Sequence, residues 1–263
     1  MTEKLRLDLL LVERGLAPTR AKAQAQIMAG EVFVEEQRID KPGTRFARNA
    51  VIRMKERPQF VSRGGDKLAG ALRDFAFDCR DLVCADVGAS TGGFTDCLLQ
   101  AGAKRVYAID VGYGQLAHKL RIDSRVINME RTNARHLERL PELVNLVVVD
   151  ASFISLRLLI PVFTVWLSSE GNIIALIKPQ FEAGREDVGK GGVVRRGEVH
   201  ERVLQEVLGF ALHQGLRLRG LTRSDLKGPS GNTEFLAWWS SGTEGAATQE
   251  ALDAAIQTVL VQS

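Results

Sequence analysis

Four ionisable residues at the ends of predicted strands and helices have side chains that suit proton transfer. They are Lys67 in "SRGGDKLAGAL", Asp150 after "NLVVV", Lys178 after "NIIALI" and Glu234 after "GPSGNT". A lysine at the end of an apolar strand is costly to desolvate unless a carboxylate pairs with it. Lysine serves as a base for a weakly acidic hydroxyl group only when its ammonium form is disfavoured, which burial and a second lysine both achieve. Two lysines and two carboxylates therefore predict a device that removes a proton from a hydroxyl group.

Each of these residues also has a purely structural interpretation, which the residues alone leave open. Lys67 suits a solvated helix position, and Glu234 suits the polar side of an edge strand. Asp150 and Lys178 would make a structural ion pair. Because these two residues follow neighbouring apolar strands, we expect them in one crevice at the carboxyl edge of the sheet.

The turn after the first apolar strand, "ADVGASTGGFTDCLLQAGA" at 85–103, carries a second set of candidate ligands. Gly88 permits a tight turn, and Gly92 and Gly93 let backbone N–H groups at a helix start approach a ligand. The turn has neither the lysine of a Walker loop nor the G-x-G-x-x-G spacing of a dinucleotide fold. Asp86 would repel a pyrophosphate and attract a cation, and Asp110, which ends the next strand, suits ribose hydroxyls. The pattern predicts S-adenosylmethionine, a nucleoside with a positive tail, although either acid alone also fits an ordinary turn residue.

Alternating strand and helix patterns predict an α/β domain around these residues. Apolar strands are predicted at 83–87, 105–109, 125–128, 144–149 and 172–177, and helices at 93–100, 116–121, 153–167 and 198–213. Such alternation is typical of a parallel sheet covered on both faces. The last two predicted strands, 220–223 and 234–239, have no helix between them, so we expect an antiparallel pair. The fold class is therefore a Rossmann-like, mostly parallel α/β sheet with an antiparallel last strand.

The first sixty residues predict a small α+β domain with a basic surface. They contain 12 Lys and Arg against 8 Asp and Glu, whereas the rest of the chain contains 23 against 24. This excess hints at a nucleic-acid partner, although a solvated charged face is the commoner explanation of such an excess. Short strands are expected within 31–36 and 50–56. A first helix is predicted to follow the spacing of Leu5, Leu9, Val12 and Leu16, and a second, capped by Thr19, to turn Ala21, Ala25 and Met28 towards it.

Composition and apolar runs exclude several classes of protein. The chain of 263 residues is 45% hydrophobic and 25% charged, as is ordinary for a globular protein with one large and one small domain. The start of the chain offers only a short apolar run, 9–12, and no segment approaches a membrane span, so we expect a cytoplasmic protein without membrane contact. Cys79, Cys84 and Cys97 lack metal-ligand spacing, and the four histidines are scattered, so no metal is expected.

The order of these motifs resembles that of the FtsJ-like ribose 2'-O-methyltransferases, and Lys67, Asp150, Lys178 and Glu234 match their Lys-Asp-Lys-Glu tetrad. More closely, "SRGGDKL", "DVGASTGGFTDCLLQAGA", "DVGYGQL", "ERTNAR", "DASFISL", "KPQFE" and "GPSGNTEF" are similar to the TlyA, or haemolysin A, family. That family joins an RNA-binding domain of the ribosomal S-four type to the methyltransferase, and the resemblance covers about residues 5–241. It implies a class I S-adenosylmethionine-dependent enzyme that methylates cytidine 2'-hydroxyls in ribosomal RNA or ribosomal subunits.

The resemblance also implies domain bounds and residue roles. The RNA-binding domain would span 1–60 and the methyltransferase domain 61–241, with a linker and helix at 242–263 that the resemblance does not cover. Lys178 would be the general base, and the other three tetrad residues would tune and orient it. The residues implied around the cofactor are Asp86, Gly88, Ser90, Gly92, Gly93, Phe94, Asp110, Glu130 and Asn133. Those expected to grip RNA are Arg6, Arg20, Lys22, Arg45, Arg48 and Arg63.

Some alternatives stay open at this point. Ser90-Thr91 and Phe94 stand where the broader FtsJ pattern has Ala-Pro and Trp, although the TlyA-type pattern accommodates them. The glycine-rich segment "EAGREDVGKGGVVRRG" fits a lid or RNA clamp as well as a disordered surface loop. The protein could instead be a non-catalytic RNA-binding or assembly factor, or a membrane-lytic haemolysin. Neither the modified nucleotide nor the oligomeric state follows from the sequence.

Overall fold

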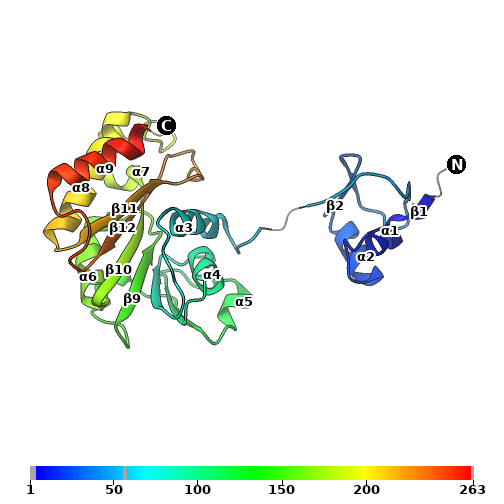
Figure 1. Ribbon diagram of the computed structural model, residues 1–263, viewed down its shortest axis with the longest axis horizontal. Helices are drawn as coiled ribbons and strands as arrows, with labels where there is room; N and C mark the ends of the chain where they lie inside the picture. The colour runs from blue at the N-terminus through cyan, green and yellow to red at the C-terminus, as the bar shows by residue number, and fades with distance from the viewer. Residues whose placement is uncertain (1–3, 56–57, 262–263) are drawn as a thin grey trace. The chain divides into compact units, whose positions relative to one another are not determined.

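The computed structural model describes residues 4–55 and 58–261. It divides into two compact units, Met1–Pro58 and Gln59–Ser263. Figure 1 labels several of the helices and strands in each unit.

The N-terminal unit combines two short helices with two small sheets. Strand β1 (Lys4–Arg6) pairs antiparallel with β4 (Arg45–Ala47), and β2 (Val32–Val34) lies between β3 (Gln37–Ile39) and β5 (Ile52–Met54). Helices α1 (Leu7–Glu13) and α2 (Arg20–Met28) pack together. The apolar core consists of Leu7, Leu11, Ala17, Ala23, Ile27, Val32, Val34 and Ala50. Because so few residues form this core, the unit gains limited stability from apolar burial.

The predicted buried faces of these two helices are wrong. Leu5 belongs to β1, where it lies opposite Phe46, so the helix starts two residues later than its spacing suggested and buries Leu7, Leu10 and Leu11. In α2 the buried residues are Ala23 and Ile27, whereas Met28 is 63% exposed. The prediction that Thr19 caps α2 is confirmed, because its Oγ1 accepts a hydrogen bond from Lys22 N at 3.2 Å.

The C-terminal unit contains a seven-stranded sheet in the order β11-β12-β10-β9-β6-β7-β8. β12 runs antiparallel to both of its neighbours, and every other pairing is parallel. The predicted mostly parallel sheet with an antiparallel last strand is thus confirmed. The strand bounds are β6 (Val83–Val87), β7 (Arg105–Ile109), β8 (Val126–Met129), β9 (Val144–Val149), β10 (Leu167–Ile177), β11 (Arg217–Arg223) and β12 (Phe235–Ser240).

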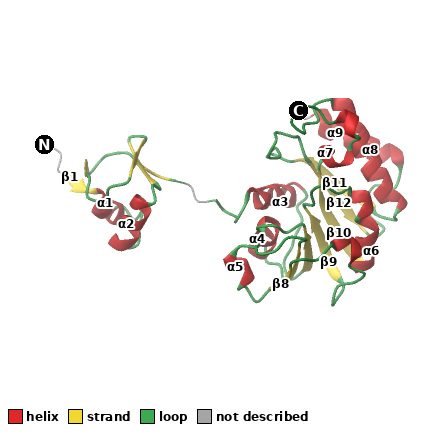
Figure 2. Cartoon of the chain, turned by 180° about the vertical axis from the view of Figure 1, so that it is seen from behind, coloured by secondary structure: helices red, strands yellow, loops and turns green. Residues whose placement is uncertain are grey.

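Helices cover both faces of this sheet, as Figure 2 shows. One face packs against α3 (Arg63–Asp74) and α4 (Gly93–Gln100), with α5 (His118–Arg121) beside them, and the other against α6 (Ile160–Trp166), α8 (Gly197–His213) and α9 (Gln249–Val261). The helix predicted over 153–167 is wrong in its first half. A 3-10 turn at Leu156–Leu158 precedes α6, because Pro161 cannot donate within a helix and is tolerated only in its first turn.

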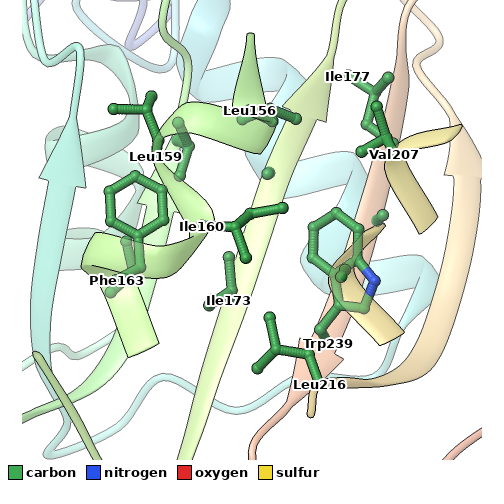
Figure 3. Close-up of a cluster of buried hydrophobic side chains, with 14 of the residues drawn as sticks. Leu156, Leu159, Ile160, Phe163, Ile173, Ile177, Val207, Leu216 and Trp239 are labelled. Atoms are coloured by element: carbon green, nitrogen blue, oxygen red, sulfur yellow. The ribbon is translucent and has the colours of Figure 1, made fainter. Parts of the chain in front are cut away.

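The larger core lies between the sheet and the helices α6, α8 and α9. Figure 3 shows Ile160 and Phe163 of α6 with Ile173 and Trp239 of the sheet. α9 adds Leu252, Ile256 and Val259, so the last described segment packs into the core of the C-terminal unit. Trp238 and Trp239 lie on opposite faces of the sheet: Trp239 is fully buried in this core, and the Trp238 ring contacts Phe75 and Phe77 on the other face.

Candidate active site

The four predicted catalytic residues form two ion pairs at the carboxyl edge of the sheet. Lys67 Nζ lies 2.5 Å from Glu234 Oε2, and their side chains are 8% and 1% exposed. Lys178 Nζ lies 2.6 Å from Asp150 Oδ1 and 2.9 Å from Ser152 Oγ. Gln180 Nε2 donates to Glu234 Oε1 at 3.3 Å, which ties the segment after Lys178 to the other pair. All four residues line the same pocket, so the solvated-helix and edge-strand interpretations of Lys67 and Glu234 are wrong.

Asp150 and Lys178 meet because they follow adjacent parallel strands. β9 and β10 pair up to Val149 and Ala175, so the residues that follow come out at the same edge. Lys178 lies immediately before α7 (Pro179–Glu182), where Pro179 occupies the first helical position. Gly88 has φ +82° and allows β6 to end beside Asp150, because a Cβ there would stand 2.8 Å from Asp150 O. The turn after β6 therefore brings the predicted cofactor loop against the catalytic pairs.

Lys67 reaches the pocket because the start of α3 is held against the start of α4. Asp96, 4% exposed, accepts hydrogen bonds from Val61 N at 2.9 Å and from Lys119 Nζ at 2.8 Å. A Cβ on Gly93 would lie 2.8 Å from Gly65 N, so only glycine lets the two helix starts approach this closely. Asp96 and Gly93 thus fix the position of α3 against α4, and with it the position from which Lys67 reaches Glu234.

The pocket has a volume of about 840 Å³ and opens between the turn after β6 and the ion pairs. Pockets that hold small molecules are typically about 300–1,000 Å³, so this one is large enough for a nucleoside cofactor and part of a substrate. Four of the predicted cofactor residues line it, namely Gly88, Ser90, Gly93 and Phe94. Gly92 packs instead against Leu116 and Leu120, where a Cβ would clash with both side chains.

Asp86 is a fully buried carboxylate at the end of β6, beneath the turn. Its Oδ2 accepts a hydrogen bond from Thr95 Oγ1 at 2.6 Å, and its Oδ1 has no partner among the described residues. Burial raises the pKa of Asp86 to about 7, because the hydrogen bonds from Thr95 offset only part of the cost of desolvating the charge. A buried acceptor without a partner fits a ligand that carries a positive charge, as the methionine portion of S-adenosylmethionine does.

Asp110, Glu130 and Asn133 follow the next two strands, outside the pocket lining. Asp110 accepts from Ser90 N at 2.8 Å and from Gly112 N at 2.7 Å, and Glu130 accepts from Gln115 N at 3.2 Å. Asn133 Oδ1 accepts from Arg135 N at 3.0 Å and caps a short turn. Each carboxylate oxygen has a second lone pair, so Asp110 retains acceptor capacity for a ribose.

The structure places the predicted RNA-binding cations in both units. Arg63 lines the pocket and donates from Nη2 to Lys227 O at 2.6 Å. The side chain of Lys22 is exposed on α2, and Arg48 Nη2 lies 3.6 Å from Glu13 Oε2. Arg6, Arg20 and Arg45 lie in or next to β1, α2 and β4 of the N-terminal unit.

Phe153 and Phe181 form an aromatic pair that sequence patterns did not single out. Their ring centroids are 4.9 Å apart, and both line the pocket. Phe153 is 90% exposed and has φ +63°, a strained conformation for a bulky residue. Glu182, 7% exposed, accepts from Ser155 Oγ at 2.6 Å and from Leu156 N at 2.7 Å, and so ties the segment after Phe153 to α7.

The glycine-rich segment 182–197 contacts the loop that precedes Glu234. Asn232, 2% exposed, accepts from Val194 N and donates to Gly192 O, both at 2.9 Å. Asp187 also pairs with Arg196 and Arg202. The segment is therefore fastened to the loop that precedes Glu234, and Gly192 contributes to the pocket lining.

Comparison with known proteins agrees with this architecture. Residues 60–241 match the family model for FtsJ-like methyltransferases, and residues 5–52 match that for the S4 domain. The Bacillus subtilis protein "Putative rRNA methyltransferase YqxC" is 50% identical over 254 residues, which cover 93% of this chain and 89% of that protein. The Mycobacterium tuberculosis protein "16S/23S rRNA (cytidine-2'-O)-methyltransferase TlyA" is 43% identical, with coverage of 99% and 98%. A solved structure described as "Putative hemolysin from Streptococcus thermophilus" is 41% identical, has a TM-score of 0.73 and covers 98% of this chain and 96% of that one.

The sheet order and the pocket at its carboxyl edge define the class of Rossmann-like methyltransferases. The chain belongs to the FtsJ-like methyltransferase family, in the group of its TlyA relatives, with an S4 domain before the catalytic unit. Within residues 4–55 and 58–261, no helix is both long and apolar enough to cross a membrane. The same residues contain no group of three His, Cys, Asp or Glu side chains placed to hold a metal ion.

Proposed function

We propose that this methyltransferase modifies the 2'-hydroxyl of a cytidine ribose in ribosomal RNA, in the cytoplasm. The observation that carries the proposal is the pair of lysine–carboxylate contacts, Lys67–Glu234 and Lys178–Asp150, around one pocket. The relative named as a 16S/23S rRNA (cytidine-2'-O)-methyltransferase supports the choice of substrate, because it matches nearly the whole chain. The S4 domain supports an RNA partner.

Lys178 is the general base of this proposal. After its ammonium group has released a proton to solvent, Nζ as an amine accepts the proton of the ribose hydroxyl. The hydroxyl oxygen keeps the electron pair and bonds to the methyl carbon, while the bond from that carbon to sulfur breaks and its electron pair goes to the sulfur. Asp150 Oδ1, 2.6 Å from Nζ, stabilises the ammonium group that results, and Ser152 Oγ, 2.9 Å away, fixes its direction. Lys67 and Glu234 line the same pocket and hold the hydroxyl in line, and such positioning accounts for much of the acceleration.

The turn after β6 holds the cofactor in this proposal. When bound, S-adenosylmethionine supplies a methyl group carried on a positively charged sulfur. Asp86 would balance that charge from below the turn, and the backbone from Gly88 to Phe94 would hold the cofactor. Asp110 would accept hydrogen bonds from the ribose, and Glu130 and Asn133 would serve the adenine.

The substrate side of the pocket combines an aromatic surface with basic residues. Phe153 presents an exposed ring beside the ion pairs, and stacking on an aromatic ring suits a base that has left its helix. Arg63 contacts a neighbouring phosphate. Further basic side chains, which belong to the N-terminal unit, bind RNA phosphates, and such contacts position the RNA without reading its sequence. These basic residues are Arg6, Arg20, Lys22, Arg45 and Arg48.

The proposal is tested by methyl transfer from radiolabelled S-adenosylmethionine to ribosomal subunits from cells that lack the protein. Wild type and Lys104→Ala should label the RNA equally, because Lys104 is an exposed residue just before β7, at the opposite edge of the sheet. Lys178→Ala should leave cofactor binding intact and abolish labelling. Unlabelled RNA with every protein, despite tight RNA binding, would favour an assembly factor. Release of dye from liposomes that Lys178→Ala does not change would favour a lytic protein.

A further inference from the structure

The N-terminal unit contains a buried carboxylate among residues that the proposed function assigns to RNA. Asp8, the second residue of α1, is completely buried. Its Oδ1 accepts from Arg6 Nε at 3.0 Å, and its Oδ2 accepts from Arg6 Nη2 at 2.9 Å, Arg20 Nε at 3.0 Å and Gln24 Nε2 at 2.8 Å. Chiefly the hydrogen bonds from Arg6 hold the pKa of Asp8 well below its usual range, so this carboxylate stays ionised.

A third cation joins the two arginines. Arg6 of β1 pairs with Arg45 of β4 across the antiparallel ladder, which places both side chains on the same face. Arg45 is exposed, and it makes no ion pair within residues 4–55. Like charges opposite each other on a ladder are destabilising unless an anion lies between or above them. Arg6 and Arg20 share the Asp8 carboxylate and Arg45 adds a third guanidinium group, so these side chains leave two positive charges without a protein counterion.

Asp8 leaves the outer edges of these guanidinium groups available to a ligand. It engages Nε and Nη2 of Arg6 and only Nε of Arg20, and the two arginine side chains remain 37% and 53% exposed. Gly43 leaves space beside the Arg6 guanidinium group, because a Cβ at position 43 would lie 3.4 Å from Nη1. Two long side chains that normally lose much freedom on binding are therefore held in place before the ligand arrives.

We propose that Asp8 is a positioning residue that holds Arg6 and Arg20, beside Arg45, as one preformed binding site for an RNA backbone phosphate. This inference rests on the proposed function, because it takes RNA as the ligand of the N-terminal unit. The proposal predicts that removing the negative charge of Asp8 weakens the binding of RNA, a polyanion. A simple count of charges predicts the opposite.

The test compares full-length Asp8→Asn with Glu36→Gln in binding to ribosomal RNA between about 50 and 200 mM salt. Both substitutions remove one negative charge from the same unit. Glu36 is 75% exposed and pairs with Arg53, which also lies over the Phe33 ring. One lost phosphate contact changes the salt slope by about 0.9, so Asp8→Asn should bind about tenfold more weakly at 0.1 M salt, with the slope reduced by about one. Glu36→Gln should bind at least as tightly as wild type. An Asp8→Asn variant that also binds as tightly overturns the proposal.

A second comparison separates positioning from a general loss of structure. In an Arg6→Ala/Arg20→Ala background, Asp8→Asn should weaken binding no further, because its effect acts through those two residues. An equal loss in that background means that Asp8 serves only the fold. If Asp8→Asn melts early, Gln24→Ala replaces it, since it loosens Asp8 without changing any charge and should also weaken binding and reduce the slope. Unchanged binding by Gln24→Ala contradicts the inference, whereas wild type without salt-dependent RNA binding contradicts the proposed function itself.

Discussion

Replacing Glu234 by glutamine should destabilise the catalytic unit, because it leaves the ammonium group of Lys67 without a counterion. The contact between Lys67 Nζ and Glu234 Oε2 is 2.5 Å long, and both side chains are more than nine-tenths buried. Breaking such a buried pair by removing one partner costs about 3–5 kcal/mol. Glutamine still offers an amide oxygen to Nζ, so we expect a loss of about 3 kcal/mol and, for a unit of this size, a midpoint about 6–12 °C lower.

The assay is thermal unfolding of wild type, Glu234→Gln, Lys67→Met and the double variant, followed by circular dichroism. The double variant should recover about 2–3 kcal/mol relative to the sum of the single variants, because no buried charge then remains unpaired. Additive losses, or a Glu234→Gln variant that unfolds with wild type, would show that the two groups do not depend on each other. That result would refute the account of the pocket as two mutually dependent pairs.

Three further predictions concern the turn and the aromatic pair. Burial raises the pKa of Asp86 to about 7, so the folded state holds this proton more tightly than the unfolded chain, and the stability it contributes is lost as pH rises through 7. Urea unfolding of the ligand-free protein should show that the unfolding free energy falls between about pH 5 and 8 by about 2–3 kcal/mol more in wild type than in Asp86→Asn. An equal fall in the two proteins would contradict this. Phe153→Ala should reduce kcat/KM for RNA by about 10- to 100-fold, with cofactor affinity and melting temperature unchanged, because a stacked base contributes about 1–3 kcal/mol and the ring is 90% exposed. Wild-type turnover by Phe153→Ala would exclude base stacking there. Gly88→Ala should remain folded but lose methyl transfer, because its Cβ would stand 2.8 Å from Asp150 O and displace the end of β9; normal activity in the same labelling assay would show that Asp150 tolerates the shift.

The sheet was predictable because its strands are buried on both faces. Three of the predicted strands, β6, β7 and β9, have the bounds that the apolar runs indicated. In a parallel sheet all strands run in the same direction, so the residues that follow them emerge at the same edge. The meeting of Asp150 and Lys178 therefore followed from sequence, whereas the partnership of Lys67 with Glu234 depends on how α3 docks against α4.

Short elements with few buried residues were predicted less well. The predicted buried face of α1 was wrong because a strand of three residues precedes the helix. A displacement of one residue turns the buried face by about 100°. Phe153 gave no periodic signal, because its exposure depends on a strained backbone. Glu182, far along the chain, holds the following segment by accepting a hydrogen bond from Leu156 N. No sequence pattern set Asp8 apart, because its burial depends on Arg20 and Gln24 of the next helix.

The most direct measurement is the chemical position of the transferred methyl group. Ribosomal RNA labelled by wild type should contain 2'-O-methylcytidine at a linkage that resists alkaline cleavage, and RNA treated with Lys178→Ala should contain none. A methyl group on a base, or equal labelling of the ribose by Lys178→Ala, would contradict the assignment of this pocket to proton removal from a ribose hydroxyl.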